Sequence, residues 1–345
     1  MYRPDQRRSC CPHYTIRLDS SQFKPSRDQR QTINRFNRYV MGETYTKEVA
    51  RLHPKSRDQA KKRDNHFDLI ERVHEAEDAQ LLKPPEAAHK LVVTLETDDF
   101  TEEKFEVYEN YQRVVHKEGP SKITAGGFKR FLCSSPLRRE TMVDSNGKER
   151  RLGSYHQCYR LDGKLWAPGK LGALYEIALS IEEGYGWWYP GFYIHSCPKM
   201  RYKIDYSPQF ILDPNSLAWD PLDRKMLDLL DKKPFVSLSL EKQRDNKSDA
   251  ESEDSKSGDD EDDWLFKTNM PGIPPLSSVA DWDLDNIALK IKPDGPLYKT
   301  SNLVIWDKRG VEDYPGLKAG VAELVAAIGP DLIDRICLDF TPRGG

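Results

Sequence analysis

Alternation of apolar and polar side chains predicts β-strands in four parts of the chain. YTIRLD at 14–19 alternates and is rich in β-branched residues. AHKLVVTLETDDF at 88–100 alternates in the same way, and we expect it to open a second domain. SYHQCYRLDGKLWA at 154–167 predicts a hairpin with Asp162–Gly163 as its turn. TSNLVIWD at 300–307 is expected to form a further strand.

Apolar residues three and four positions apart predict the helices. KPSRDQRQTINRFNRYVMGE at 24–43 has Ser26 as N-cap and one face made of Ile33, Phe36, Tyr39 and Val40. TEEKFEVYENYQRVVHK at 101–117 is amphipathic, with Thr101 as its cap. Further helices are expected at three places, the last of them ending at Gly329–Pro330 before a shorter helix: 66–82, 170–186 and 316–340.

Charge is unevenly distributed, and this suggests four segments. Residues 1–66 hold 16 Lys/Arg against 7 Asp/Glu, whereas 241–263 hold 11 Asp/Glu against 4 Lys/Arg. The basic block fits either a polyanion such as RNA or a solvated helical face. The acidic stretch lacks periodicity and predicts a disordered insertion. We expect an N-terminal domain at 1–85, a second domain at 86–240, the insertion at 241–263 and a C-terminal extension at 264–345.

Composition narrows the class of protein. The 345 residues are 37% hydrophobic and 32% charged, which leaves enough apolar residues for a core. No apolar run approaches the roughly 18 residues of a membrane span, and the N-terminus has no secretory signal. The six cysteines are too few for a disulfide scaffold, so a reducing compartment and free or metal-binding thiols are expected. A reducing compartment agrees with a location in the cytoplasm. We also expect a monomer, with the nucleus as a second location.

The stretch GWWYPGFYIHSCPKMRYKIDY at 186–206 mixes many rings with cations. His195, Lys199, Arg201 and Lys203 form its strongest group. If 199–203 is extended, alternation places the three long cations on one face, where they repel each other unless an anion is bound. A phosphate or a carboxylate fits that role, and a solvated strand edge is the alternative.

Weaker candidates lie before this stretch. His116 and Lys117 end a predicted helix, where the helix dipole alone also favours cations. Lys129 and Arg130 stand between Phe128 and Phe131, and the preceding Gly126–Gly127 allows a phosphate to approach the backbone. Cys10 and Cys11 are adjacent and can share a metal ion only with ligands from elsewhere, because the chain contains no C-x-x-C. Two incidental cysteines are the alternative.

With these residues in view, the chain resembles the arginyl-tRNA–protein transferases. RPDQRRSCCPHYTIRLDSSQFKPSRDQRQTINRFNRY resembles part of that family's N-terminal domain, including its Cys-Cys-Pro motif. FEVYENYQRVVHK, GGFKRFLCSSPL, GSYHQCYRLDGKLWA and GFYIHSCPKMRYKIDYSPQFILDP resemble successive blocks of its C-terminal domain. The resemblance covers nearly the whole chain, and its last block is long and highly specific.

The resemblance implies an α+β fold, with a GNAT-like acyltransferase domain after an N-terminal cysteine-motif domain. It implies transfer of arginine from arginyl-tRNA to proteins that begin with Asp, Glu or oxidised Cys, which marks them for ubiquitin-dependent degradation. Arginyl-tRNA and such proteins are then the partners. The catalytic candidates are Tyr193, His195 and Tyr202. The substrate-binding candidates are His116, Lys129, Arg130, His156, Lys199, Arg201 and Lys203.

The chain departs from the family at two places. The family carries a C-x-x-C upstream that joins the Cys-Cys pair at a zinc or iron–sulfur site, so Cys10 and Cys11 give at most half of that ligand set. DGKLWA also runs directly into PGKLGALYEIAL, where the family has two further strands of its central sheet. Losing two central strands costs more than the stability of a typical domain. We expect a chain truncated at its N-terminus and missing a core segment near Ala167–Gly169, which leaves the sheet incomplete; a different fold is the alternative.

Two other functions are compatible with the sequence. A non-catalytic protein could keep the surface that binds tRNA or the acceptor without transferring arginine. An acetyl-coenzyme A acyltransferase needs a Gly-rich pyrophosphate loop, and KLGALYEI at 170–177 lacks the required spacing. Acetyl-coenzyme A is therefore not expected as a cofactor.

Overall fold

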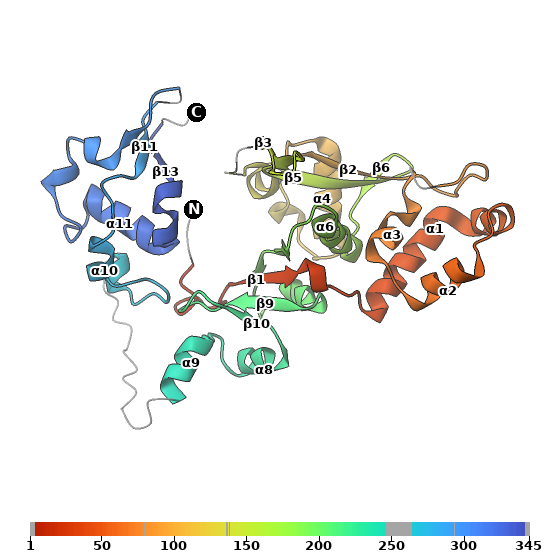
Figure 1. Ribbon diagram of the computed structural model, residues 1–345, viewed down its shortest axis with the longest axis horizontal. Helices are drawn as coiled ribbons and strands as arrows, with labels where there is room; N and C mark the ends of the chain where they lie inside the picture. The colour runs from red at the N-terminus through yellow and green to blue at the C-terminus, as the bar shows by residue number, and fades with distance from the viewer. Residues whose placement is uncertain are drawn as a thin grey trace. The chain divides into compact units, whose positions relative to one another are not determined.

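The computed structural model describes residues 4–78, 81–135, 137, 139–245, 264–292 and 294–341. The chain divides into two compact units (Figure 1). Unit 2 comprises residues 17–190 and 202–209, and unit 1 comprises residues 1–16, 191–201 and 210–345. The domain boundary expected near Pro85 falls inside unit 2. The described elements mix helices with several small sheets, as expected for an α+β protein, while the GNAT-like arrangement stays a prediction.

Unit 2 holds the longer helices and one three-stranded antiparallel sheet in the order β2-β5-β6. Its helices are α1 (Arg27–Leu52), α2 (Arg57–Asn65), α3 (Leu69–Val73), α4 (Glu102–Val114), α5 (Ala125–Phe128) and α6 (Lys170–Glu182). Its strands are β2 (Leu91–Thr97), β3 (Glu140–Val143), β4 (Glu149–Leu152), β5 (Tyr155–Leu161), β6 (Lys164–Trp166) and β7 (Trp187–Trp188). The hairpin expected at Asp162–Gly163 is confirmed, because Leu161 pairs with Lys164 across that turn.

Unit 1 contains shorter elements. Its helices are α7 (Pro198–Arg201), α8 (Arg224–Lys232), α9 (Leu238–Asp245), α10 (Leu276–Ala280) and α11 (Leu317–Ile328). Its strands are β8 (Phe192–Tyr193), β9 (Gln209–Leu212, whose first residue belongs to unit 2), β10 (Trp219–Pro221), β11 (Ala288–Lys290), β12 (Tyr298–Lys299) and β13 (Cys337–Asp339). Helix α9 includes residues 241–245, so these are helical rather than part of a disordered insertion. The rest of that predicted insertion lies outside the described residues.

Strand β1 (Tyr14–Asp19) confirms the first alternating stretch. Its even-numbered residues Tyr14, Ile16 and Leu18 are buried, whereas Thr15, Arg17 and Asp19 are partly exposed. In unit 1, Tyr14 pairs with Tyr193 of β8. In unit 2, Leu18 pairs with Trp188 of β7. The chain therefore passes between the units within one strand, and each half pairs with residues far along the sequence.

The main hydrophobic core of unit 2 lies where α6 meets β5, α1 and α3. Leu174 and Ile177 of α6 are fully buried there, together with Tyr159 of β5. Ile33 from α1 joins this core, and Val40 joins a smaller cluster with Leu91. Tyr39, expected on the same buried face, is 56% exposed and stacks on His89 instead. A separate core in unit 1 surrounds Trp306 and the apolar face of α11.

Two expected helices start at the predicted caps. The Ser26 hydroxyl accepts a hydrogen bond from the Gln29 amide, and the Gln29 side chain accepts one from the Ser26 amide, which completes a capping box. The Thr101 hydroxyl accepts a hydrogen bond from the Lys104 amide at the start of α4.

The strand prediction at 300–307 is wrong. Residues 300–302 and 306–308 form single 3₁₀ turns, and Val304 is 89% exposed.

Gly42 interrupts α1 with a φ of 79°, a conformation that favours glycine. A Cβ at this position would lie 2.7 Å from the Cβ of Ala88. We expect Gly42→Ala to lower the free energy of unfolding by about 1–3 kcal/mol, because it adds both backbone strain and this clash. Urea denaturation would measure the change. Gly147→Ala is the control, since Gly147 has the same φ with no atom within 4 Å of the added Cβ. Equal losses would show that the contact with Ala88 is unimportant.

Candidate functional site

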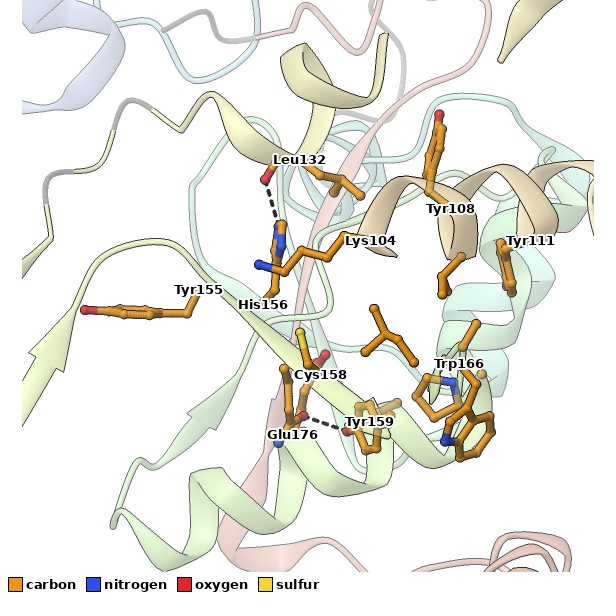
Figure 2. Close-up of a pocket in the computed structure, with 18 of the residues that line it drawn as sticks. Lys104, Tyr108, Tyr111, Leu132, Tyr155, His156, Cys158, Tyr159, Trp166 and Glu176 are labelled. Carbon is orange, nitrogen blue, oxygen red and sulfur yellow. Dashed lines mark hydrogen bonds between the residues drawn. The ribbon is translucent and has the colours of Figure 1, made fainter. Parts of the chain in front are cut away.

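A cavity of about 590 Å³ opens within unit 2, and α4, β5, β6 and α6 supply most of its lining. Figure 2 shows several of these side chains arranged around the opening. Aromatic rings dominate the walls, and they come from Tyr108, Tyr111, Phe128, Tyr155, Tyr159, Trp166, Trp188 and Tyr202. The cavity therefore offers flat apolar surfaces with few polar groups, which is typical of small-molecule sites.

Helices α4 and α6 approach the sheet from its two faces. Neighbouring residues of a strand point to opposite faces. Arg160 contacts Glu103 of α4, whereas Tyr159 packs against α6. Strand β6 lies at the end of the sheet order, and the cavity takes in Leu165, Trp166 and the following residues 167–169. The cavity thus lies at the open edge of the three-stranded sheet.

Lys104 is a buried cation of the cavity wall, and its charge is balanced locally. Its Nζ donates to the carbonyl oxygens of Thr97 (2.8 Å) and Asp99 (3.3 Å) and lies 3.5 Å from a carboxylate oxygen of Glu96. The Arg160 guanidinium also binds Glu96 and lowers the pKa of that carboxyl to about 2. Arg160 also contacts Glu103. The cluster therefore contains two cations and two carboxylates and has no excess charge.

His156 and Cys158 lie two positions apart in β5 and therefore share one face of the strand. The His156 Nε2 lies 2.9 Å from the Leu132 carbonyl oxygen and donates to it (Figure 2). Burial raises the pKa of the Cys158 thiol to about 11, and the nearby Glu96 carboxylate adds to this effect. A thiol with a raised pKa forms less of the nucleophilic thiolate at neutral pH.

Glu176 brings a carboxylate to the aromatic part of the cavity. The indole Nε1 of Trp188 donates a 2.9 Å hydrogen bond to its Oε2. Figure 2 shows Glu176 beside Tyr159, whose own pKa it raises in addition to the effect of burial. The surrounding protein displaces water and raises the pKa of the Glu176 carboxyl, which outweighs the opposite effect of the Trp188 hydrogen bond. Glu176 was not among the predicted site residues, because its hydrogen-bond partner Trp188 belongs to a different element.

The residues predicted from the sequence are only partly brought together. His156 and Tyr202 line the cavity. His116 lies outside it, with its ring 5.1 Å from that of Tyr111. Lys129 lies over the ring of Phe100 at 4.3 Å, and Arg130 is exposed.

The expectation that residues 199–203 are extended is wrong. Residues Pro198–Arg201 form the short helix α7, and Tyr202–Asp205 form a 3₁₀ turn. Proline suits the first turn of a helix, which explains why the alternation does not produce a strand. Lys199 and Arg201 are exposed, but Lys203 is only 7% exposed and is not available to a substrate. The three cations therefore do not share one face.

Tyr193 and His195 form a hydrogen-bonded chain with Asp231 inside unit 1. The Tyr193 hydroxyl lies 2.7 Å from His195 Nδ1, and His195 Nε2 lies 2.8 Å from the Asp231 carboxylate. The His195 contact lowers the pKa of Asp231. Tyr193 is fully buried, so its hydroxyl serves His195 rather than a solvent-borne ligand. Asp231 was not predicted, because nothing in the sequence of α8 distinguishes it from other helical acids.

Cys10 and Cys11 are both exposed, and their sulfur atoms are 3.9 Å apart. Within the described ranges, no group of three or more His, Cys, Asp or Glu residues is placed to hold a metal ion. Two thiols alone do not fill the four positions of a structural zinc or iron–sulfur site. The residues present do not fit such a group, and a metal at this position stays a prediction.

The cavity lies within the part of the chain that matches a known family model. The family model described as "Arginine-tRNA-protein transferase, C terminus" matches residues 103–169 and 166–213, and the one described as "Arginine-tRNA-protein transferase, N terminus" matches 1–31. Over these residues the chain is similar to the arginyl-tRNA–protein transferase family. Both pieces of the C-terminal match contribute to the cavity, one through α4, β5 and β6 and the other through α6 and Trp188.

Three relatives illustrate how far the similarity extends. Arginyl-tRNA–protein transferase 1 of Arabidopsis thaliana is 33% identical over 210 residues, which cover 51% of this chain and 32% of the relative. The Saccharomyces cerevisiae protein of the same name is 24% identical over 263 residues, covering 64% and 47%. An aspartate/glutamate leucyltransferase of Teredinibacter turnerae is 26% identical over 139 residues, covering 36% and 57%. The chain spans about a third to a half of the length of the two curated eukaryotic relatives.

Among the described residues, no helix is both long enough and apolar enough to cross a membrane.

Proposed function

We propose that this chain transfers arginine from arginyl-tRNA to the N-terminal amine of proteins that begin with Asp, Glu or oxidised Cys. The added arginine would mark those proteins for ubiquitin-dependent degradation in the N-degron pathway. The observation that carries the proposal is the cavity that both pieces of the family match enclose. The Teredinibacter relative, named for aspartate and glutamate acceptors, supports the acidic class of acceptor.

The cavity suits a reaction that needs no protein nucleophile. The acceptor nitrogen attacks the carbonyl carbon of the aminoacyl ester, an amide bond forms, and the bond to the ribose oxygen breaks. The proton lost by the amine ends on that ribose hydroxyl. An α-amino group has a pKa of about 8, so a usable fraction is neutral at pH 7 without a strong base. The protonated Cys158 thiol agrees with direct transfer.

The remaining roles follow from exposure. Tyr202 lines the cavity and is proposed to donate a hydrogen bond to the developing oxyanion, with His156 as a substrate contact. Lys199 and Arg201 are exposed and are proposed to bind tRNA phosphates or the acceptor carboxylate. His195 is proposed to act through its bonds to Tyr193 and Asp231. His116, Lys129 and Arg130 are outer candidates for the same phosphates.

We expect Arg201→Ala to lower the transfer rate at least about tenfold, because a charge-assisted contact to phosphate or carboxylate is worth more than about 1.4 kcal/mol. His195→Ala and Lys199→Ala are expected to act in the same direction. The measurement uses labelled arginyl-tRNA and a peptide that starts with Asp, with a peptide that starts with Ser as the negative acceptor. Lys225→Ala, an exposed cation of α8, is the control. Unchanged rates in all three variants would overturn these roles, and no transfer by the unmodified chain would overturn the function.

Two observations favour a second candidate, a protein that binds tRNA or acceptor without transferring arginine. The family match is split at 166–169, beside the last strand of the β2-β5-β6 sheet. The Trp166 Nε1 is buried and has no hydrogen-bond partner in the described part of the chain. Both fit a core segment that is missing at this edge. Binding of arginyl-tRNA without labelled peptide would support this candidate.

A further inference from the structure

Glu176 is the single carboxylate among the described residues that line the cavity. The other charged side chain of the wall, Lys104, is balanced by Glu96. No ion pair joins Glu176 to a cation among the residues that the structure describes, and one of its oxygens is held by the neutral Trp188 indole. The uncompensated charge of the cavity is therefore negative.

Small residues on α6 beside Glu176 leave space in the cavity next to its carboxylate. Residues three and four positions apart lie on the same helix face. The two such neighbours toward the N-terminus are Ala173 and Gly172, and both line the cavity. Leu174 and Ile177 point instead into the hydrophobic core. The helix thus presents small residues and one carboxylate to the cavity and keeps its large apolar residues away from it.

Aromatic rings complete the surroundings of this carboxylate. The Trp188 indole donates a hydrogen bond to the carboxylate. Burial raises the pKa of Tyr159, Tyr202 and Tyr206, and the Glu176 carboxylate adds to the shift in all three. A carboxylate among ring faces favours a flat, weakly hydrated cation over a compact, strongly hydrated one. Guanidinium matches this description better than ammonium, because it can stack on a ring while it donates to a carboxylate oxygen.

We propose that Glu176 and the aromatic walls beside it bind the guanidinium of the transferred arginyl group, and that Glu176 therefore determines which aminoacyl group is accepted. This inference rests on the proposed function, and it assigns to one residue the selection of a cationic side chain. An uncharged side chain would leave the carboxylate without a cationic partner in the cavity.

The test compares two ligands that differ in charge but not in length. Arginine amide carries the guanidinium, and citrulline amide replaces it with a neutral urea group. Calorimetric titration of the full chain should show that arginine amide binds at least about tenfold more tightly. Glu176→Gln should reduce that preference to less than about threefold. Glu109→Gln is the matched control, because Glu109 is exposed on α4 and does not line the cavity.

A second variant separates charge from folding. Glu176→Asp keeps the carboxylate on a shorter arm and should retain part of the preference, and both variants should melt within a few degrees of the unmodified chain. Equal affinity of the unmodified chain for the two amides would overturn the inference, as would a full preference in a folded Glu176→Gln protein. The transfer assay is independent of this titration. Arginine preference without transfer would refute the proposed function alone, and transfer without arginine preference would refute this inference alone.

Discussion

Leu174→Ala is expected to lower the free energy of unfolding of unit 2 by about 3–5 kcal/mol. Leu174 has no exposed surface and lies in the core with Tyr159 and Ile177. Removing its branched end leaves a void between α6, β5 and α1, and a helix fixed on several sides cannot move to fill it. Urea denaturation followed by tryptophan fluorescence would measure the loss.

The matched control for this prediction is Leu179→Ala on the same helix. Leu179 is partly exposed and is not part of the core cluster, so the same substitution should cost clearly less there. Equal losses at the two positions would mean that helix propensity or general loss of apolar area, rather than the packing at Leu174, holds α6. The result also bears on the site, because Leu174 fixes the helix that carries Glu176.

The second large effect concerns pH and the Glu96–Arg160 pair. The Arg160 hydrogen bond is the main reason that the pKa of Glu96 lies near 2 instead of 4.5. A carboxyl with a lowered pKa in the folded state adds stability that is present above about pH 4.5 and is lost as pH falls toward 2. We expect the stability difference between the unmodified chain and Glu96→Gln to shrink by about 2–3 kcal/mol from neutral pH to about pH 2.

Denaturation curves of both proteins at a series of pH values would test this expectation. Taking the difference between the two cancels the titration of all other acids. The control repeats the comparison in an Arg160→Gln background, where the pH dependence of the difference should largely disappear. In proteins that keep Arg160, a stability difference between the unmodified chain and Glu96→Gln that stays constant with pH would show that the ion pair is too well solvated to contribute to stability.

Local patterns in the sequence predict the elements whose residues contact mainly each other or one flat surface. The Ser26 and Thr101 caps, the Asp162–Gly163 turn and the alternation of β1 follow from residues a few positions apart. The strand prediction at residues 300–307 is wrong because groups far away in the sequence determine the conformation of this segment. The Thr300 hydroxyl donates to the Leu284 carbonyl, and the Trp306 indole donates to Asp285, which bends the segment into turns.

The candidate site shows the same division between local and distant information. His156 and Tyr202 were singled out by residue type within blocks typical of the family, and both line the cavity. Glu176 and Asp231 were not singled out, because in the sequence each is an ordinary acid on an amphipathic helix. Only the folded structure brings their hydrogen-bond partners next to them. Trp188 reaches Glu176 from a strand twelve positions along, and His195 reaches Asp231 from outside its helix. Proximity of this kind is a property of the fold and leaves no periodic trace in the chain.

The pairing of β1 delays its folding during synthesis on the ribosome. Residues 14–15 pair with 192–193, and 18–19 pair with 187–188. At about 5–20 residues per second, the strand waits roughly 10–35 s on the nascent chain before its partners are synthesised. Throughout that interval the strand lacks the partner strands that pair with it in the folded protein. The strand that joins the two units therefore stays incomplete while about 170 residues are synthesised, and chaperones have that interval in which to bind it.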